Sequence, residues 1–363
     1  MLAIVVCNEL QKRIGKSHQT TLNSLKSHEG HNVIKDAMLW EPIESEAVHC
    51  FACAHECKIK KWDRGICHVR QNLDGKLKTL IYAEVSSMNV DPIEKKPLYH
   101  FYPGSKVFSL GSVSCNFRCE HCQNYDISFA EVGELATTEI PPERSVQLAL
   151  ERNCRGIAWT YNEPTIWFEY TYDSAILAKE AGLYTVYVTN GYMTSQALEK
   201  IGPYLDAANV DVKGFSKRFY NGVCKARLDP VLKTCERMHE HGIHLELTYL
   251  VIPGLNDDEE QLAAFSEWAA GVDRDLPVHF SRFHPDWRML DRPATPIETL
   301  ERAHSAAARA GLRYIYLGNI PSQHENTFCP ECGAVIVERT GYTIKKQGKH
   351  CPGCGREAPT VDQ

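Results

Sequence analysis

The sequence predicts an α/β fold: a partial (β/α)6 TIM-like barrel, with a small cysteine-rich unit before it and a zinc-ribbon-like unit after it. From Val107 onward, short apolar runs alternate with segments of helical periodicity. This alternation implies a parallel sheet with right-handed crossovers. About six such repeats favour a partial barrel over a doubly wound sheet. Cysteines cluster on both sides of this region, and they predict the two small units.

Seven strands are expected in the barrel region, near residues 107–111, 156–160, 184–189, 208–212, 244–251, 278–283 and 313–317. The helices between them are expected near residues 143–153, 165–181, 194–201, 229–241, 257–270 and 296–310. Pro142 suits the start of the first helix, while Thr194 and Asp257 can cap the third and the fifth. Glycine follows three of these helices, as C-terminal turns prefer, at Gly182, Gly242 and Gly311.

The composition is that of an ordinary globular protein, with 43% hydrophobic and 24% charged residues in a chain of 363. The formal net charge of −6 provides no global basic field that would favour nucleic acid. The apolar run Met1–Cys7 is too short to cross a bilayer and lacks the features of a signal peptide.

The 15 cysteines are mostly clustered, so metal ligation is expected rather than disulfides, in a reducing, cytoplasmic compartment. The cysteines outside the clusters are interpreted as buried or incidental thiols, because free cysteine commonly behaves as a small hydrophobic residue. These are Cys7, Cys154, Cys224 and Cys235.

Four segments are expected along the chain. They are a lead-in with few signals at residues 1–43, an N-terminal cysteine-rich metal-binding unit at 44–100, the barrel at 101–320 and the C-terminal unit at 321–363. Within the N-terminal unit, Leu77–Val85 is predicted to be a strand that follows a turn at Asp74-Gly75. The passage Asp91–Leu98 is predicted to be a linker to the barrel.

Three cysteines, Cys115, Cys119 and Cys122, follow the first expected barrel strand in a C-x3-C-x2-C arrangement. Three thiolates on one short loop suit iron–sulfur or zinc chemistry. A [4Fe–4S] cluster has four irons, so these cysteines would leave one iron without a protein ligand. The alternative is a structural zinc loop with a distant fourth ligand, although this spacing is uncommon for zinc. Barrel active sites lie at the carboxyl ends of the strands, where this loop is expected.

The N-terminal unit contains a second set with the spacing C-x2-C-x3-C-x9-C, formed by Cys50, Cys53, Cys57 and Cys67. Four thiolates are enough for one tetrahedral zinc site or one auxiliary [4Fe–4S] cluster, and both interpretations stay open. The segment has few large apolar residues, so a metal is expected to stabilise it. Nearby histidines more often support a metal site or lie at the surface than act as ligands. They are His49, His55 and His68.

The C-terminal unit contains paired cysteines with the spacing C-x2-C-x18-C-x2-C, at Cys329, Cys332, Cys351 and Cys354. Paired knuckles at this spacing strongly indicate a metal, and zinc is favoured over a rubredoxin-like iron site. The residues between the pairs, Val335–Arg339 and Tyr342–Ile344, are expected to form a short hairpin.

Polar side chains are expected at the carboxyl ends of the second and third strands. Asn162 and Glu163 follow the second strand and could bind an ammonium group, although Glu163 could instead be a carboxylate at a helix start. Asn190 follows the third strand, in a turn with groups that suit a ribose or a nucleobase. An Asn-Gly turn by itself also accounts for that residue.

Further candidates follow the fourth and sixth strands. Asp211 and Lys213 are two residues apart, so both are expected to point into the barrel. Together they could bind a hydroxyl and a carboxylate of a ligand. The alternative is a simple buried ion pair, but such pairs are costly enough to favour a site. The sixth strand is followed by His284.

Several strings, taken together, resemble the radical S-adenosylmethionine (SAM) superfamily. The resemblance is closest to the radical SAM enzymes of the AmmeMemoRadiSam system, which are relatives of pyruvate formate-lyase activating enzymes. It covers the chain from about residue 44 to the C-terminus. The matching strings are Ser87–Leu98, the Cys115–Asn124 loop, Thr160–Thr165, Asp211–Gly214 and the cysteine units at each end.

The resemblance implies that Cys115, Cys119 and Cys122 hold a [4Fe–4S] cluster, and that SAM binds the open iron through its amino and carboxylate groups. One residue departs from the family pattern. The position before the third cysteine is often a larger aromatic residue in the superfamily, and here it is His121. The cluster does not depend on that residue, but the packing against adenine does.

The resemblance also assigns roles to the residues at the strand ends. Glu163, preceded by Asn162, occupies the position of the family's motif for the SAM amino group. Asp211 and Lys213 resemble the D-x-K contact to SAM in the activating enzymes. His284 resembles a histidine near the adenosyl group.

The implied activity is reductive cleavage of SAM to methionine and a 5′-deoxyadenosyl radical, which abstracts hydrogen from a substrate. That substrate could be a partner protein that receives a glycyl radical, as in the relatives, or another macromolecule or metabolite. An electron donor such as flavodoxin or ferredoxin is implied, and a membrane or nucleic-acid partner is not expected. The alternatives are a non-catalytic iron–sulfur or zinc electron-transfer protein and a zinc-ribbon nucleic-acid adaptor.

Overall fold

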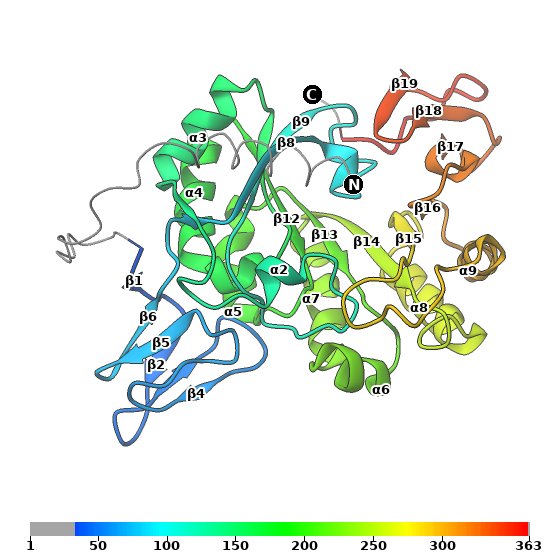
Figure 1. Ribbon diagram of the computed structural model, residues 1–363. Helices are drawn as coiled ribbons and strands as arrows, with labels where there is room; N and C mark the ends of the chain where they lie inside the picture. Colours follow the sequence, from blue (N-terminus) through cyan, green and yellow to red (C-terminus); the bar gives the residue numbers. More distant parts are fainter. Residues whose placement is uncertain (1–32, 362–363) are drawn as a thin grey trace, which may run out of the picture. The chain divides into compact units, whose positions relative to one another are not determined.

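The computed structural model describes residues 33–361, and its centre is an eight-stranded sheet (Figure 1). Seven of these strands are parallel, and each lies beside the one before it in the chain. They are β9 (Lys106–Gly111), β11 (Gly156–Trp159), β12 (Tyr184–Thr189), β13 (Ala207–Asp211), β14 (His244–Val251), β15 (Val278–Arg282) and β16 (Ile315–Gly318). All seven expected strands are confirmed, and closure of the barrel stays a prediction.

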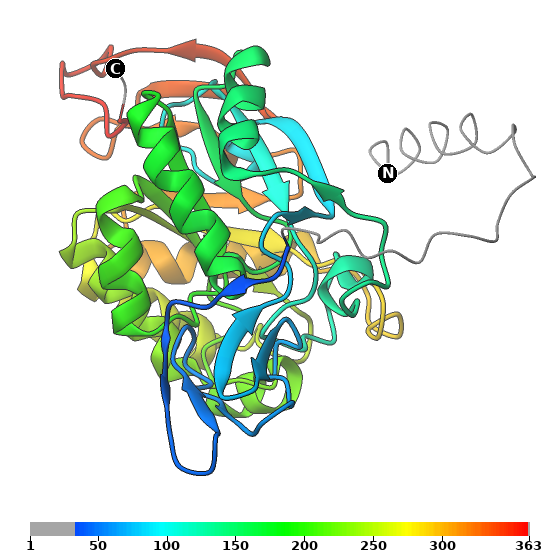
Figure 2. The same cartoon turned by 90° about the vertical axis from the view of Figure 1, so that its left-hand side faces the viewer.

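A helix of at least seven residues follows each of the first six parallel strands, which confirms the expected alternation. These helices are α3 (Pro142–Glu151), α4 (Phe168–Glu180), α5 (Ser195–Ile201), α7 (Leu228–Glu240), α8 (Glu259–Val272) and α9 (Ile297–Ala310). Figures 1 and 2 show α3 and α4 (green) side by side against the sheet, where α4 contacts β11 and β12. The strands β11 and β12 are almost wholly buried, as expected for parallel strands covered on both faces.

The helix ends follow the predicted signals with one correction. The Thr194 hydroxyl accepts a hydrogen bond from the Ala197 N–H at 3.2 Å and caps α5. The cap of α8 is Asp258 and not Asp257, because the Asp257 carboxylate instead accepts from the Gly254 N–H at 2.7 Å. The three glycines after α4, α7 and α9 all have positive φ, which confirms them as C-terminal turns; they are Gly182, Gly242 and Gly311.

The eighth strand of the sheet corrects the predicted linker. β8 (Ser87–Pro92) pairs antiparallel with β9, and a 3-10 turn, η1 (Ile93–Lys95), follows it. Asp91 lies at the end of β8 and is buried, with its carboxylate bound by Lys95 at 2.9 Å and Lys96 at 2.7 Å. Asp91, Lys95 and Lys96 of the predicted linker therefore satisfy one another.

Two small antiparallel sheets form most of the N-terminal region. One contains β2 (Trp40–Pro42), β3 (Val48–Cys50) and β4 (Lys58–Ile59), and the other contains β1 (Lys35–Asp36), β5 (Arg70–Leu73) and β6 (Lys76–Thr79). The predicted turn at Asp74-Gly75 joins β5 to β6, and both of its residues have positive φ. The single strand predicted over Leu77–Val85 is wrong, because β6 ends at Thr79 and β7 (Glu84–Val85) pairs with β10 (Thr138–Glu139).

The predicted C-terminal hairpin is confirmed. β18 (Val335–Thr340) pairs antiparallel with β19 (Thr343–Gln347) and with the short β17 (Thr327–Phe328), which follows the 3-10 turn η5 (Gln323–Glu325). The guanidinium of Arg339 donates to the carbonyl oxygen of Tyr99 at 2.6 Å. This bond attaches the hairpin to the chain segment that leads from η1 to β9.

A buried carboxylate holds the same segment against the amino-terminal ends of two strands. Glu246 in β14 accepts hydrogen bonds from the backbone N–H groups of Tyr99 and His100, at 2.9 and 2.7 Å. The imidazole of His279 in β15 donates to it at 2.6 Å. His100 in turn lies 2.6 Å from the hydroxyl of Tyr316 in β16. The network therefore joins three neighbouring strands at the end opposite their carboxyl termini.

Within residues 33–361, no helix is both long and apolar enough to cross a membrane. The apolar run Met1–Cys7 and most of the predicted lead-in lie outside the described residues.

Candidate active site

The loop with Cys115, Cys119 and Cys122 leaves the carboxyl end of β9 and runs into the short helix α2 (Tyr125–Ser128). The guanidinium of Arg118 holds the loop in a closed turn, because it donates to the carbonyl oxygens of Cys115 at 2.7 Å and Phe117 at 3.1 Å. Cys119 is buried, and the other two cysteines are half-buried. The loop thus lies where barrel enzymes carry their chemistry.

Burial raises the pKa of each of these thiols, and for Cys119 a hydrogen bond with Cys224 is the largest cause. Cys119 and Cys122 also raise the pKa of Cys115, so the three thiols are close enough to oppose one another's ionisation. A cation that offsets their charge would favour the thiolate forms, which is how a metal centre binds cysteine. This donor set fits a metal centre.

Cys224, interpreted from the sequence as a buried or incidental thiol, is buried and lies beside Cys119. It ends a one-turn π-helix, η4 (Tyr220–Cys224), that follows the short α6 (Lys217–Phe219). Its carbonyl oxygen accepts a hydrogen bond from the Arg118 N–H at 3.0 Å.

Asn162, at the carboxyl end of β11, holds the start of the cysteine loop from both sides. Its side-chain oxygen accepts from the Ser112 N–H at 3.1 Å, and its amide nitrogen donates to the Ser114 carbonyl at 2.8 Å. Both contacts lie within three residues of Cys115. The Asn162 amide therefore positions the first cysteine.

Asn190, at the end of β12, contacts the same loop. Its amide nitrogen donates to Oδ1 of Asn116 at 2.8 Å and lies 3.9 Å from Sγ of Cys115. Its side-chain oxygen accepts from the Tyr192 N–H at 3.0 Å, which is the turn expected from the sequence. Asn116 is buried, and its side-chain amide nitrogen has no hydrogen-bond partner among the described residues.

Glu163 is buried and connects the ends of β11 and β12. Its Oε1 accepts from the backbone N–H of Thr165 at 2.9 Å and from the hydroxyl of Thr189 at 2.7 Å. Its Oε2 accepts from the Asn190 N–H at 2.8 Å. The carboxylate caps the 3-10 turn η2 (Pro164–Trp167), as expected of a carboxylate at a helix start. Burial nevertheless raises its pKa, so the hydrogen bonds only partly offset the loss of water.

Asp211 and Lys213 form an ion pair of 2.8 Å at the end of β13. Both side chains are partly exposed, at 29% and 19% of their surface. Burial by itself lowers the pKa of Lys213. The interactions with Asp211 and Cys119 raise this pKa by more than burial lowers it, so the ammonium group stays charged. Cys119 and Lys213 therefore lie near each other, which brings this pair to the cysteine loop.

Two histidines differ from each other in their surroundings. His121 is buried, and neither ring nitrogen has a hydrogen-bond partner among the described residues. Burial, with a contribution from Lys213, lowers its pKa to about 3, so the ring is neutral. His284 is exposed and follows β15 by two residues, and no hydrogen bond within residues 33–361 joins it to the cysteine loop.

Two hydrogen bonds that reach the cysteine loop were not predicted from the sequence. His55 of the N-terminal region donates from Nε2 to the Asn116 carbonyl at 2.8 Å, and Arg118 donates to the Ile66 carbonyl at 3.2 Å. Both bonds join the N-terminal cysteine region to the cysteine loop. A histidine beside a cysteine set was one available signal, but its partner lies 61 positions away in the chain.

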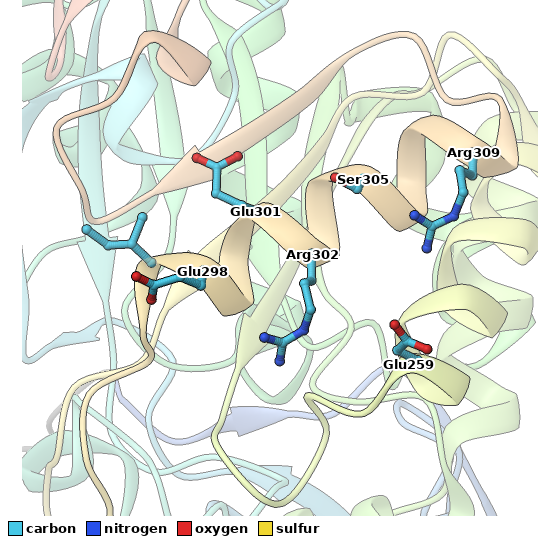
Figure 3. Close-up of a pocket in the computed structure, with 7 residues that line it drawn as sticks. Glu259, Glu298, Glu301, Arg302, Ser305 and Arg309 are labelled. Atoms are coloured by element: carbon cyan, nitrogen blue, oxygen red, sulfur yellow. The ribbon is translucent and has the colours of Figure 1, made fainter.

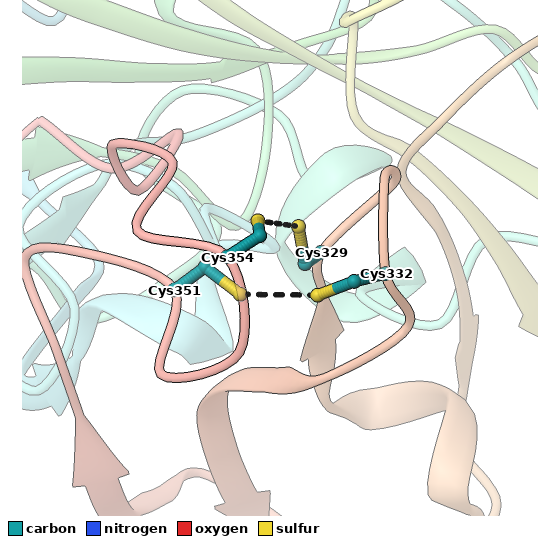
Figure 4. A group of neighbouring side chains, drawn as sticks. All are labelled: Cys329, Cys332, Cys351 and Cys354. Carbon is teal, nitrogen blue, oxygen red and sulfur yellow. Dashed lines mark hydrogen bonds between the residues drawn. The ribbon is translucent and has the colours of Figure 1, made fainter.

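The C-terminal cysteines converge as a single-ion site requires (Figure 4). Their ligand atoms all lie within 4.8 Å of one another, with Sγ distances of 3.6 Å between Cys329 and Cys354 and 3.4 Å between Cys332 and Cys351. Zinc–sulfur bonds of about 2.3 Å imply sulfur–sulfur distances of roughly 3.8 Å in a tetrahedron. The four thiols therefore fit one metal ion.

An open depression between the start of α8 and α9 lies apart from all predicted ligands (Figure 3). It is lined by charged side chains, among them Glu259, Glu298, Arg302 and Arg309. None of the predicted cysteine, cofactor-binding or metal residues borders it.

Comparison with known proteins gives a family for the chain. Residues 110–266 match the model of the radical SAM superfamily. The chain is 43% identical over 335 residues to the uncharacterized protein MJ0808 of Methanocaldococcus jannaschii, which covers 90% of this chain and 100% of that protein. It is 26% identical over 153 residues to the pyruvate formate-lyase-activating enzyme of Clostridium pasteurianum. That match covers 41% of this chain and 63% of the enzyme, so the chain spans less than two thirds of that relative.

Two solved structures are similar to part of the chain. Streptococcus suis SuiB bound to S-adenosylmethionine has a TM-score of 0.46 at 14% identity, covering 60% of this chain and 49% of that chain. A domain of a pyruvate-formate lyase-activating enzyme from Bacteroides vulgatus has a TM-score of 0.41 at 16% identity, covering 45% and 99%.

Proposed function

We propose that this chain, which belongs to the same family as protein MJ0808 and contains a radical SAM domain, is a radical SAM enzyme that cleaves SAM reductively. The observation that carries the proposal is the buried cysteine loop at the end of β9, held by Asn162 and Asn190 from the next two strands. When bound, a [4Fe–4S] cluster supplies the electron that converts SAM into methionine and a hydrogen-abstracting 5′-deoxyadenosyl radical.

In this proposal, Cys115, Cys119 and Cys122 hold the cluster. The Lys213 ammonium is charged and partly exposed beside the loop, which suits the carboxylate of SAM. Asp211, its ion-pair partner, suits a ribose hydroxyl. These side chains orient the ligand, and the apolar surroundings of the loop exclude water from a reactive intermediate.

The roles of the other strand-end residues follow from their contacts. Glu163 Oε2 accepts a single hydrogen bond and retains a lone pair for the SAM amino group. Asn162 and Asn190 are bound to the cysteine loop and position it. His284 is proposed to border the adenosyl group. His121, whose ring nitrogens are unpaired within the described residues, supports a hydrogen bond to a bound nucleobase.

The substrate is proposed to be a partner protein that receives a glycyl radical. Support comes from the partial sequence similarity to a pyruvate formate-lyase-activating enzyme. The strings around Asp91 and Glu163 support membership in the AmmeMemoRadiSam group. A cytoplasmic one-electron donor such as flavodoxin or ferredoxin completes the proposal, since each cleavage of SAM consumes one electron.

The test is to reduce the anaerobically reconstituted protein with dithionite, add SAM and measure 5′-deoxyadenosine. Wild type and Cys154→Ser are expected to form it, because Cys154 lies outside the cysteine loop. Cys119→Ser is expected to form none. A wild-type protein that contains iron and sulfide but forms no 5′-deoxyadenosine would refute the proposal and favour an electron-transfer protein.

A further inference from the structure

All four N-terminal cysteines border one enclosed cavity. Its walls also include His55, Arg70 and Thr165. The cysteines are Cys50, Cys53, Cys57 and Cys67. Three of them are buried and Cys57 is half-buried. The four thiols therefore line one shared site.

The spacing of these sulfurs differs from that of the C-terminal set. Within residues 33–361, Cys329 and its three partners form the one group of metal-ligating side chains whose atoms all converge within 4.8 Å. Cys50, Cys53, Cys57 and Cys67 do not form such a group. A zinc ion needs sulfurs roughly 3.8 Å apart, whereas a cube of four irons and four sulfides holds its cysteines further apart. The more widely spaced sulfurs of the N-terminal cysteines therefore fit a four-iron cluster better than a single zinc ion.

Arg70 provides the independent evidence for a bound group. Its side chain is 2% exposed, and its Nη2 donates to both carboxylate oxygens of Glu169, at 2.9 and 2.8 Å. Its Nε and Nη1 are buried without a partner among the described residues. Unpaired charged donors are costly in a protein interior. An anionic group with several sulfur acceptors in the adjoining cavity would satisfy them.

We propose that Cys50, Cys53, Cys57 and Cys67 hold a second [4Fe–4S] cluster rather than a zinc ion. Every iron of this cluster has a cysteine ligand, so it offers no open position to SAM. Two hydrogen bonds connect it to the first cysteine loop, one from His55 to the Asn116 carbonyl and one from Arg118 to the Ile66 carbonyl. The inference goes beyond SAM cleavage and does not depend on it.

The test is metal analysis of the full chain, purified anaerobically and reconstituted, in which Cys115, Cys119 and Cys122 are replaced together by serine. We expect about four irons, about four sulfides and about one zinc per chain. After dithionite reduction, its EPR signal is expected to be unchanged by SAM. A variant with about two zinc ions and no iron would overturn the inference.

Two further proteins guard against a variant that fails to fold. The wild type is expected to contain about eight irons, and Cys53→Ser/Cys67→Ser about four, with an EPR signal that SAM does change. Cys154→Ser/Cys235→Ser is the matched control and is expected to retain all the iron of wild type. A wild type with about four irons and two zinc ions would also overturn the inference. Eight irons without formation of 5′-deoxyadenosine would instead refute the proposed function alone.

Discussion

The imidazole of His55 lies 2.8 Å from the backbone carbonyl oxygen of Asn116 and thereby joins the N-terminal cysteine region to the loop with Cys115. The ring also packs edge-on against Tyr192, with centroids 4.8 Å apart. This contact fixes the relative position of two cysteine sets that are far apart in the sequence.

Replacing His55 by phenylalanine should weaken this attachment. The aromatic contact is kept, but the Asn116 carbonyl loses its donor, which typically costs about 1–3 kcal/mol when the group is buried. We expect a lower denaturation midpoint for the reconstituted protein. The matched control is His49→Phe, since His49 bonds the exposed Glu41 side chain. Equal midpoints for His55→Phe and wild type would contradict the positioning role.

Asn162→Ala should loosen the first cysteine of the loop. The change removes the hydrogen bonds to Ser112 and Ser114, at a cost of roughly 1–3 kcal/mol. Iron should therefore be lost to an external chelator several-fold faster than from wild type, as followed by the absorbance of the chelate. Asn89→Ala, at an exposed strand position, is the control and should release iron at the wild-type rate.

Removing metal from the C-terminal cysteines should unfold the hairpin but not the sheet. Structural zinc contributes apparent binding free energies on the order of 10–16 kcal/mol in small modules. In Cys329→Ser, amide hydrogen exchange should accelerate in Val335–Gln347, while β9 to β16 keep their protection. Cobalt substitution of wild type should give the spectrum of a tetrahedral thiolate site. An unchanged exchange rate in the hairpin would show that the metal is not needed there.

The stability of the protein should fall below pH 6.5, in part because of His100. Burial lowers the pKa of His100 to about 3 in the folded protein, against about 6.5 in an unfolded chain. Between these values the unfolded state binds more protons, so stability decreases as the pH falls, by up to about 1.4 kcal/mol per pH unit.

The measurement is urea denaturation between pH 6.5 and 5, above the range in which Glu246 would be protonated in an unfolded chain. His100→Gln should show a shallower loss of stability than wild type over this range. The exposed His350 supplies the control, since His350→Gln should leave the slope unchanged. Equal slopes for wild type and His100→Gln would contradict the prediction.

The repeating elements could be predicted because their signals are local. Apolar runs and C-terminal glycines such as Gly182 and Gly311 placed the parallel strands and their helices closely. One failure was the passage Asp91–Leu98, which was predicted to be a linker. Asp91 belongs to a strand of the main sheet, because Lys95 and Lys96 satisfy it inside the fold. Pairing of this kind cannot be read from composition.

The candidate site was predictable as a set of residue types at strand ends and less so as a set of contacts. Asn190 was expected either to bind a ligand or to form an Asn-Gly turn, and its side-chain amide contacts Asn116 and Tyr192. Glu163 was expected either to bind an amine or to start a helix, and it caps η2. Cys224 was expected to be a buried or incidental thiol; it is buried, and it adjoins Cys119.

By itself, the sequence determined the three cysteine sets and the alternation of strands and helices, since cysteine spacing and hydrophobic periodicity are properties of short segments. Only the tertiary structure decided what each polar group binds. The Arg70–Glu169 pair joins residues 99 positions apart, and the Asn190–Glu163 contact joins residues 27 apart. The Asn190–Glu163 contact forms because the ends of neighbouring parallel strands meet at one edge of the sheet, whereas the Arg70–Glu169 contact joins β5 of the N-terminal region to α4. The two unpaired nitrogens of Arg70, beside four thiols, became visible only in that arrangement.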